Sequence, residues 1–307
     1  MYSVFYKLYF YLKRKEKYKK VKNAKQSKIS SLLFGIIEQY YNIFFKKWCI
    51  KHPRTKIGVN KLPREKKIIV SLTSFPKRIN TVWLTIETLL RQSVKPDSVI
   101  LWLAASQFDG LNSLPKELLK LQDRGLTIRF CDDLRSHKKY FYVMQEYPND
   151  LIVLADDDMF YPTDTIKKLI KLHKQYPNDI CTITCQVITD FFESQPSSWR
   201  NPEVNEKFEH SGRVQVFTGS GSLYPPNCLD KSAFNKSLIE ELCPNADDLW
   251  LTFMALKNNT KITALYPWRA FPITIYGTSE NSLWYINSED GQNNIQWRNL
   301  LNYFKEQ

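Results

Sequence analysis

Three adjacent carboxylates, Asp156, Asp157 and Asp158, follow directly on the apolar run LIVLA at 151–155. Neighbouring carboxylates repel one another, and they lose hydration when they stand at the end of a buried strand. A divalent cation relieves both effects, because hard cations prefer carboxylate oxygens and Mg²⁺ typically combines one or two carboxylates with substrate phosphates. The triplet therefore predicts a metal site for a diphosphate-bearing ligand. The simpler interpretation is an acidic turn before the helix that begins near Thr163.

A second acidic pair, Asp247 and Asp248, lies far downstream in the segment CPNADDLWLTFMALKN. The apolar residues behind it recur at helical spacing: Leu249, Phe253 and Leu256. The pair therefore opens a helix, where the positive helix end stabilises negative charge. Two interpretations stay open, an N-terminal cap or a general base near the metal site with Trp250 packed beside it.

Strands alternate with helices around these motifs. The predicted strands are 68–74, 99–104, 126–130, 151–155 and 180–187, and the predicted helices are 79–92, 114–125, 136–148 and 163–177. This alternation is typical of a doubly wound parallel sheet. Ligands bind such sheets beyond the carboxyl ends of the strands, where SLTSFPKR (71–78) and the acidic triplet lie. The chain has no GxGxxG and no GxxxxGK[ST] motif, so it lacks the phosphate cradles of dinucleotide-binding and P-loop proteins.

The positive charge is confined to the N-terminal part of the chain. The formal net charge is +13, yet residues 1–67 alone carry 19 basic and 3 acidic side chains, which leaves 25 basic and 28 acidic ones in the remainder. A nucleic-acid-binding domain would spread its basic residues over the folded surface. The charge distribution therefore indicates no nucleic-acid partner.

An amphipathic helix is predicted within this basic segment. Its apolar residues follow i, i+3, i+4 spacing: Ile29, Leu32, Leu33, Ile36, Ile37, Tyr40, Tyr41, Phe44 and Phe45. The uncharged stretch is short for a membrane span and Glu38 interrupts it, so a helix lying on an anionic membrane surface explains the pattern better. The alternative is a helix packed on the protein's own body or on a second subunit of a homo-oligomer.

No signal peptide is visible, and six cysteines without CxxC spacing fit a reducing compartment. We therefore expect a cytoplasmic protein that is peripheral on the inner face of the cell membrane.

The succession SLTSFPKR, SHKKYFY, LADDDMFYP, GSGSLYPP and ADDLW resembles bacterial GT-A glycosyltransferases, in particular the family-2-like transferases among capsule and lipopolysaccharide enzymes. The resemblance covers about residues 66–298. It implies an α/β GT-A fold, a mostly parallel sheet flanked by helices, with an N-terminal helical extension. The domains expected are a membrane-associating or oligomerising segment at 1–65, a catalytic domain at 66–275 and a C-terminal tail at 276–307.

The resemblance also implies roles for individual residues. Asp156 and Asp158 would hold Mn²⁺ or Mg²⁺, with Asp158 in direct contact, and Asp248 would be the base with Asp247 positioning it. The residues implied to bind the nucleotide sugar are Thr73, Ser74, Phe75, Arg78, Lys138, Lys139, Asp156 and Asp157.

For the acceptor, the small residues Gly219, Ser220 and Gly221 would let a sugar approach the backbone closely; an ordinary turn is the alternative. Trp250 and other tryptophans would offer a stacking platform: Trp199, Trp268, Trp284 and Trp297.

The leading functional interpretation is a metal-dependent glycosyltransferase. It would move a sugar from a UDP- or GDP-linked donor to a glycan or lipid-linked acceptor in surface polysaccharide biosynthesis, with inversion favoured by the resemblance. One alternative is a nucleotidyltransferase, although SLTSFPKR is not the Gly-rich basic loop of such enzymes. Another is a non-catalytic membrane-bound carbohydrate-binding module, against which the two acidic motifs argue.

Overall fold

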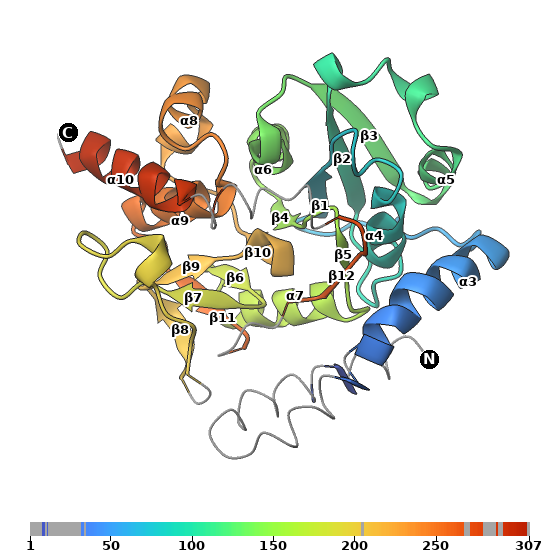
Figure 1. Ribbon diagram of the computed structural model, residues 1–307, viewed down its shortest axis with the longest axis horizontal. Coiled ribbons are helices and arrows are strands. Elements are labelled where there is room, and N and C mark those ends of the chain that lie inside the picture. Colours follow the sequence, from blue (N-terminus) through green and yellow to red (C-terminus); the bar gives the residue numbers. More distant parts are fainter. Residues whose placement is uncertain are drawn as a thin grey trace.

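The computed structural model describes residues 8, 9, 11, 32, 33, 35–203, 206–266, 271–278, 287 and 291–305. An eight-stranded mixed sheet forms its centre (Figure 1). In spatial order the strands are β3 (Leu126–Cys131), β2 (Ser98–Ala104), β1 (Ile68–Thr73), β4 (Leu151–Leu154), β10 (Ser222–Tyr224), β6 (Ile180–Thr182), β11 (Ile262–Ala264) and β8 (Phe208–Ser211). β3, β2, β1 and β4 run parallel, whereas β10 is antiparallel to both of its neighbours.

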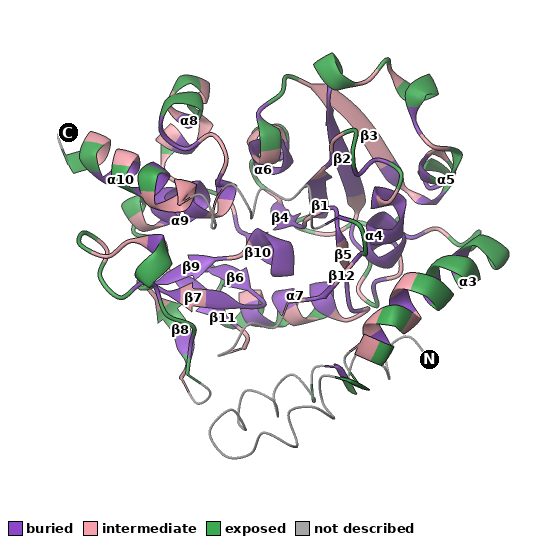
Figure 2. Ribbon diagram, in the orientation of Figure 1, coloured by how far each residue is buried: buried purple, intermediate pink, exposed green. Residues whose placement is uncertain are grey.

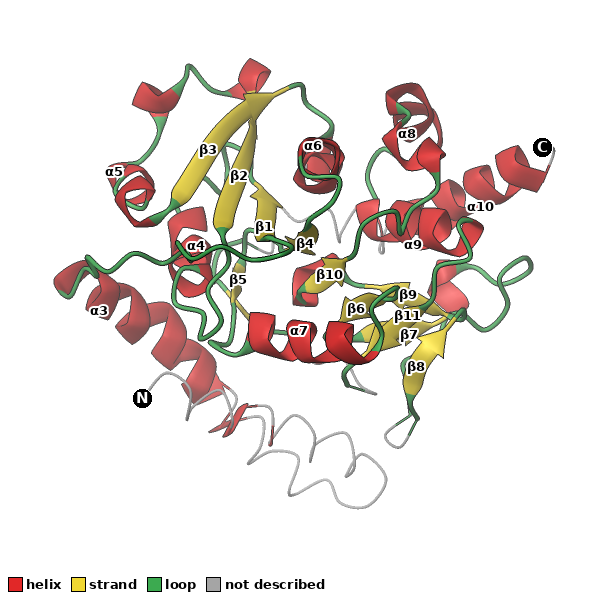
Figure 3. Ribbon diagram, turned by 180° about the vertical axis from the view of Figure 1, so that it is seen from behind, coloured by secondary structure: helices red, strands yellow, loops and turns green. Residues whose placement is uncertain are grey.

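Helices cover both faces of this sheet, so the predicted α/β architecture with a mostly parallel sheet is confirmed. The first face packs against α4 (Val82–Leu89), α5 (Lys116–Leu119) and α7 (Thr165–Gln175). The second face packs against α6 (Lys138–Glu146), α8 (Lys236–Leu242), α9 (Asp247–Lys257) and α10 (Gln292–Lys305). Figure 3 shows the two groups of helices from behind.

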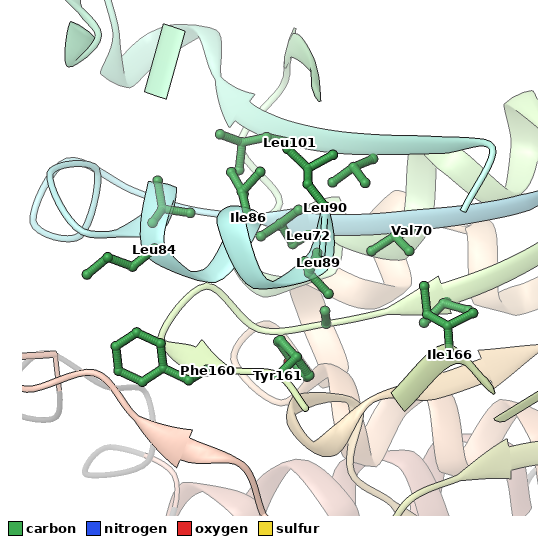
Figure 4. Packing of buried hydrophobic residues seen from close by; sticks show 14 of the residues in the cluster. Val70, Leu72, Leu84, Ile86, Leu89, Leu90, Leu101, Phe160, Tyr161 and Ile166 are labelled. Atoms are coloured by element: carbon green, nitrogen blue, oxygen red, sulfur yellow. The ribbon is translucent and has the colours of Figure 1, made fainter. Parts of the chain in front are cut away.

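The parallel strands are apolar at nearly every position because both of their faces are buried. Along β1, Val70 and Leu72 enter the cluster beneath α4, and Ile69 enters the cluster beneath α6. Figure 4 shows Leu72 among Ile86, Leu89 and Leu90 at the end of α4, with Val70 farther along the same strand. This two-sided burial holds the strand ends, and with them the acidic triplet, in a fixed position.

The strand predicted at 180–187 is broken into two. β6 ends at Thr182, and β7 (Cys185–Val187) pairs with β9 (Val214–Val216) in a separate antiparallel ribbon. At the break, Thr182 Oγ1 donates a hydrogen bond to the carbonyl of Thr184 at 2.9 Å, a local bond that competes with strand pairing. A third small sheet joins β5 (Met159–Phe160) to β12 (Ile273–Thr274).

The N-terminal helix packs on the body of the protein through one face. Residues 35–39 are helical and continue through the π-helical turn η1 (Tyr40–Phe45) into α3 (Lys46–Lys51). The buried side chains are four residues apart: Ile37, Tyr41, Phe45 and Cys49. The rings of Tyr41 and Phe45 lie 5.7 and 5.6 Å from the ring of Phe160. This face of the predicted amphipathic helix therefore contributes to the core beneath α4. Ile29, also predicted to belong to the helix, lies outside the described residues.

The opposite face of the same helix is apolar and exposed. We call it the exposed helix face; it consists of Ile36, Ile43, Phe44, Trp48 and Ile50. Phe44 is 62% exposed, and the exposed Lys46 and Lys47 follow after the buried Phe45. Figure 2 shows exposed residues along α3. Among the described residues, no helix is both long enough and apolar enough to cross a membrane.

Candidate active site

A cleft of about 1010 Å³ opens at the carboxyl ends of β1 and β4 and extends to β7, β9 and the first turn of α9. Its size matches sites that enclose a small organic ligand. The residues expected to bind the donor, hold the metal or act as base all line it: Thr73, Ser74, Phe75, Arg78, Lys138, Lys139, Asp156, Asp157, Asp158, Asp247 and Asp248. The structure therefore brings together motifs that lie as much as 175 residues apart in the chain.

Lys139 connects the two acidic motifs. Its ammonium nitrogen lies 2.5 Å from Asp156 Oδ1 and 2.8 Å from Asp247 Oδ2, and it donates a hydrogen bond to Thr218 Oγ1 at 2.7 Å. The side chain is 3% exposed, and such burial lowers the pKa of a lysine. Here Asp156, Asp247 and Asp248 outweigh burial and raise the pKa of Lys139 well above its ordinary value, so the lysine stays charged.

Asp157 fixes the loop after β1. Its carboxylate accepts hydrogen bonds from Ser74 Oγ at 2.5 Å and from Arg78 Nη1 at 2.7 Å, and its carbonyl accepts one from Thr85 Oγ1 at 2.8 Å. Arg78 also lies 3.1 Å from Asp158 Oδ2. The middle carboxylate thus ties the predicted nucleotide-contacting residues to the acidic triplet.

Asp158 keeps an incompletely compensated negative charge. Burial raises the pKa of its carboxyl to about 7; Arg78 opposes this shift, and Asp157 and Asp156 add to it. A carboxylate in this state gains from a second cation. Together with Asp156, it presents the one or two carboxylates that Mg²⁺ or Mn²⁺ uses when substrate phosphates complete the coordination shell. Within the described part of the chain, no group of three or more Asp, Glu, His or Cys side chains is arranged to hold a metal ion by itself.

Asp247 and Asp248 have different surroundings although they are adjacent. Burial raises the pKa of Asp247, but the ion pair with Lys139 outweighs burial and lowers it. Asp248 Oδ1 accepts hydrogen bonds from Thr218 Oγ1 at 2.6 Å and from Thr218 N at 3.0 Å. Burial, followed by repulsion from Asp247, raises the pKa of Asp248 to about 7. Asp248 is therefore the member of the pair that can take up a proton near neutral pH.

Further cations border the donor side of the cleft. Lys138 is buried and lies 2.5 Å from Asp133 Oδ1, and Arg135 donates to Asn245 Oδ1. Arg135, Asp133 and Asn245 line the cleft, but nothing in the sequence singled them out. Arg135 has a positive φ of 50°. An arginine in a sequence does not indicate that its backbone adopts this conformation.

Gly219 lies behind the acidic triplet and does not line the cleft. A Cβ at this position would stand 2.3 Å from Asp156 Oδ2, so the missing side chain makes room for the carboxylate. Tyr161, which the sequence also left unassigned, joins the two: its hydroxyl accepts a hydrogen bond from Asp156 N at 2.8 Å and donates one to Gly219 O at 3.0 Å.

The other residues expected at an acceptor site lie in the interior. Trp250 is fully buried and its Nε1 donates to a backbone carbonyl at 3.3 Å. Ser220 is 1% exposed, and Gly221 has a positive φ of 97° that suits the turn before β10. Trp199 and Trp297 are buried against each other, and Trp268 and Trp284 lie outside the described residues. The three candidate stacking residues that the structure describes, Trp199, Trp250 and Trp297, are therefore core side chains.

Comparison with protein families finds one match. The model described as glycosyl transferase family 2 matches residues 73–238, more than half of the chain. The matched region contains the acidic triplet, whereas Asp247 and Asp248 lie beyond its end. Among curated proteins, none matches this chain.

Three solved structures are similar at low identity. A mannosyltransferase from Pyrobaculum calidifontis, PcManGT in complex with GDP-Man and Mn²⁺, shares 13% identity over 95% of this chain and 74% of its own, with a TM-score of 0.47. S. aureus TarS residues 1–349 in complex with UDP-GlcNAc shares 13% over 65% of this chain and 56% of that chain, with a TM-score of 0.44. A CMP:2-keto-3-deoxy-manno-octonic acid synthetase complexed with CTP shares 12% over 65% and 89%, with a TM-score of 0.39. This chain thus spans just over half of the TarS chain.

Proposed function

The chain belongs to glycosyl transferase family 2, and we propose that it is a metal-dependent, inverting enzyme that transfers a sugar from a UDP- or GDP-linked donor to a glycan or lipid-linked acceptor. One observation carries this proposal. A single buried ammonium group, Lys139 Nζ, joins the first carboxylate of the triplet to the acidic pair at the start of α9. A donor site and a proton acceptor therefore lie on the two sides of one lysine, as transfer between two bound substrates requires.

The donor side supplies positive charge for a leaving diphosphate. Arg78 lies in the turn that follows β1, and Lys138 and Lys139 are the first two residues of α6; all three line the cleft. Asp156 and Asp158 would hold the Mn²⁺ or Mg²⁺, which adds further charge stabilisation for the leaving group. Ser74 and Thr73 present hydroxyls in the same region, and Thr73 Oγ1 donates to the carbonyl of Trp102 at 2.8 Å.

Asp248 is proposed as the general base. The acceptor hydroxyl oxygen bonds to the anomeric carbon of the donor sugar, the bond from that carbon to the diphosphate oxygen breaks, and the hydroxyl proton passes to Asp248. Thr218 holds the carboxylate through two hydrogen bonds. Asp247 stays ionised in its pair with Lys139 and so serves as a positioning residue. A base with a pKa near neutrality suits this step, because it is ionised before the reaction and still basic enough to accept the proton.

We further propose that the exposed helix face attaches the enzyme to the inner, anionic surface of the cell membrane. Bulky apolar side chains with lysines beside them are the pattern of an interfacial helix, and each lysine near an anionic leaflet contributes about 1 kcal/mol. A second subunit is the other occupant that such a face could take. The proposal that the product becomes part of a surface polysaccharide rests on the sequence resemblance alone.

The proposed activity is tested by product analysis. Purified protein is incubated with a panel of UDP- and GDP-sugars in Mn²⁺, in Mg²⁺ or in EDTA, and the released nucleotide is identified chromatographically. We expect a nucleoside diphosphate, released only with metal. Asp158→Asn should abolish this reaction, and Asp164→Asn should not, because Asp164 is a half-buried carboxylate paired with Lys168 outside the cleft. Pyrophosphate as the product would identify a nucleotidyltransferase, and saccharide binding without turnover would identify a binding module.

A further inference from the structure

The ribbon of β7 and β9 forms the end of the cleft beyond Asp248. Gln186 and Gln215 are direct partners across this antiparallel pair, so their side chains leave the same face of the ribbon. Both line the cleft. Their neighbours Cys185, Val214 and Val216 point to the other face and are buried in the core beneath α6, which fixes the direction of the two glutamines.

The amide of Gln215 is available to a ligand. The residue is 5% exposed and borders the cleft, and its amide forms no hydrogen bond with another described residue. An amide has two donor hydrogens and an acceptor oxygen. Gln186 is anchored through its Nε2, which donates to Trp199 O at 2.9 Å, so its carbonyl oxygen is directed elsewhere. The pair offers both donors and acceptors to a ligand in the cleft.

An aromatic ring continues the same face towards the proposed base. Phe217 follows Gln215 by two residues in extended backbone, so it shares the face of that glutamine, and it lines the cleft. The ring of Phe271 lies 5.2 Å from the ring of Phe217. The next residue, Thr218, is the one that holds Asp248. A ligand resting on the glutamines and on Phe217 would therefore extend to the base.

The charge of the cleft changes along its length. The described lining residues contributed by β7, β9, η6 (Pro196–Ser198) and α10 carry no charge: Gln186, Gln215, Pro196, Ser197, Asn293 and Asn294. The charged lining residues lie instead at the strand ends and at the start of α6 and α9. Among the described lining residues, an anionic ligand would find no cation in the uncharged part, and burial of an unpaired charge is strongly unfavourable.

We propose that Gln186, Gln215 and Phe217 form the acceptor subsite, and that its ligand is an uncharged saccharide. The amides would bind neighbouring hydroxyl groups and the ring would contact the apolar face of the sugar, an arrangement of apolar surface with a few placed polar groups that is usual in small-molecule sites. This assignment rests on the proposed transferase function and adds the chemical class of the acceptor.

The test compares donor hydrolysis with transfer. Wild type, Gln186→Ala, Gln215→Ala and Phe217→Leu are assayed with the active nucleotide sugar, first alone and then with methyl glycosides of glucose, galactose and N-acetylglucosamine. Glucose 6-phosphate and methyl glucuronoside are the anionic probes. The matched control is Gln145→Ala on the outer side of α6, where the amide bonds only to the carbonyl of Phe141. The melting temperature of each variant checks the fold. Phe217→Leu retains apolar volume and so keeps the test valid if Gln215→Ala fails to fold.

We expect transfer to at least one neutral glycoside and none to the anionic probes. Gln186→Ala and Gln215→Ala should each lower kcat/KM for the neutral acceptor by about fivefold, since a hydrogen bond contributes about 1 kcal/mol. Phe217→Leu should lower it by a similar factor through loss of ring contact, while metal-dependent donor hydrolysis and the KM for donor stay within about twofold of wild type in all three variants. The subsite assignment is wrong if sugar is transferred only to the anionic probes or if no neutral glycoside is an acceptor. It is also wrong if the folded variants lose hydrolysis and transfer to the same extent. Absence of metal-dependent hydrolysis in the wild type would instead refute the proposed function.

Discussion

Replacement of Gly219 by alanine should damage the site without damaging the fold. The backbone at Gly219 is not in the left-handed region, so alanine is compatible with it, but the new Cβ would stand 2.3 Å from Asp156 Oδ2. Ordinary contacts between such atoms are longer by about 1 Å, so the carboxylate must move by a comparable distance and weaken its 2.5 Å pair with Lys139. A misplacement of about 1 Å in a reacting site can lower the rate by about 10²-fold.

The assay for Gly219→Ala is metal-dependent donor hydrolysis over a Mn²⁺ titration, with thermal unfolding measured in parallel. We expect the rate to fall by about 10²-fold and the Mn²⁺ requirement to rise, while the melting temperature changes little. Gly212→Ala is the matched control, because its Cβ would meet only Lys261 Nζ at 3.5 Å. A Gly219→Ala protein with wild-type rate and Mn²⁺ dependence would show that Asp156 does not act from its observed position.

Three further outcomes are expected. Because the base must be ionised, kcat/KM should rise about tenfold per pH unit below the pKa of Asp248, about 7, and level off above it; a profile that is flat from pH 5 to 8 would exclude this base. Lys139→Met should lower the free energy of unfolding, measured by urea denaturation, by about 3–5 kcal/mol, because it leaves buried carboxylates without a cation. Adding Asp247→Asn should restore part of that loss. A decrease below about 1 kcal/mol would mean that the ion pairs contribute little to stability. The double variant Ile36→Asp, Phe44→Asp should no longer float with anionic vesicles at low salt but should hydrolyse the donor normally, since both side chains are exposed. If the wild-type protein does not float and instead dimerises through this face, the membrane assignment is wrong.

The parallel half of the fold could be predicted from the sequence because its strands are buried on both faces. The runs at 68–74, 99–104, 126–130 and 151–155 match β1, β2, β3 and β4 to within one residue at every end. The acidic motifs could also be recognised in the sequence, because adjacent carboxylates at a strand end or a helix start repel one another unless a cation compensates them.

The rest of the site depends on contacts between distant segments. Gln186 and Gln215 meet only because β7 pairs with β9, and neither residue carries a local signal. Gly219 looks like an ordinary turn residue until Asp156 is placed beside it. The exposed and buried faces of the N-terminal helix are equally apolar in sequence, so the packing of Tyr41 on the body had to be seen in three dimensions.

The central claim is that the two acidic motifs divide the work in one cleft, Asp158 holding the metal and donor and Asp248 accepting the proton. Equilibrium binding of the nucleotide sugar with and without Mn²⁺, measured beside single-turnover transfer for Asp158→Asn and Asp248→Asn, tests it most directly. Asp158→Asn should lose the Mn²⁺-dependent part of donor binding, whereas Asp248→Asn should bind donor as the wild type does and transfer at least about 10²-fold more slowly. The opposite pattern, with donor binding lost in Asp248→Asn and retained with full transfer in Asp158→Asn, would contradict the assignment.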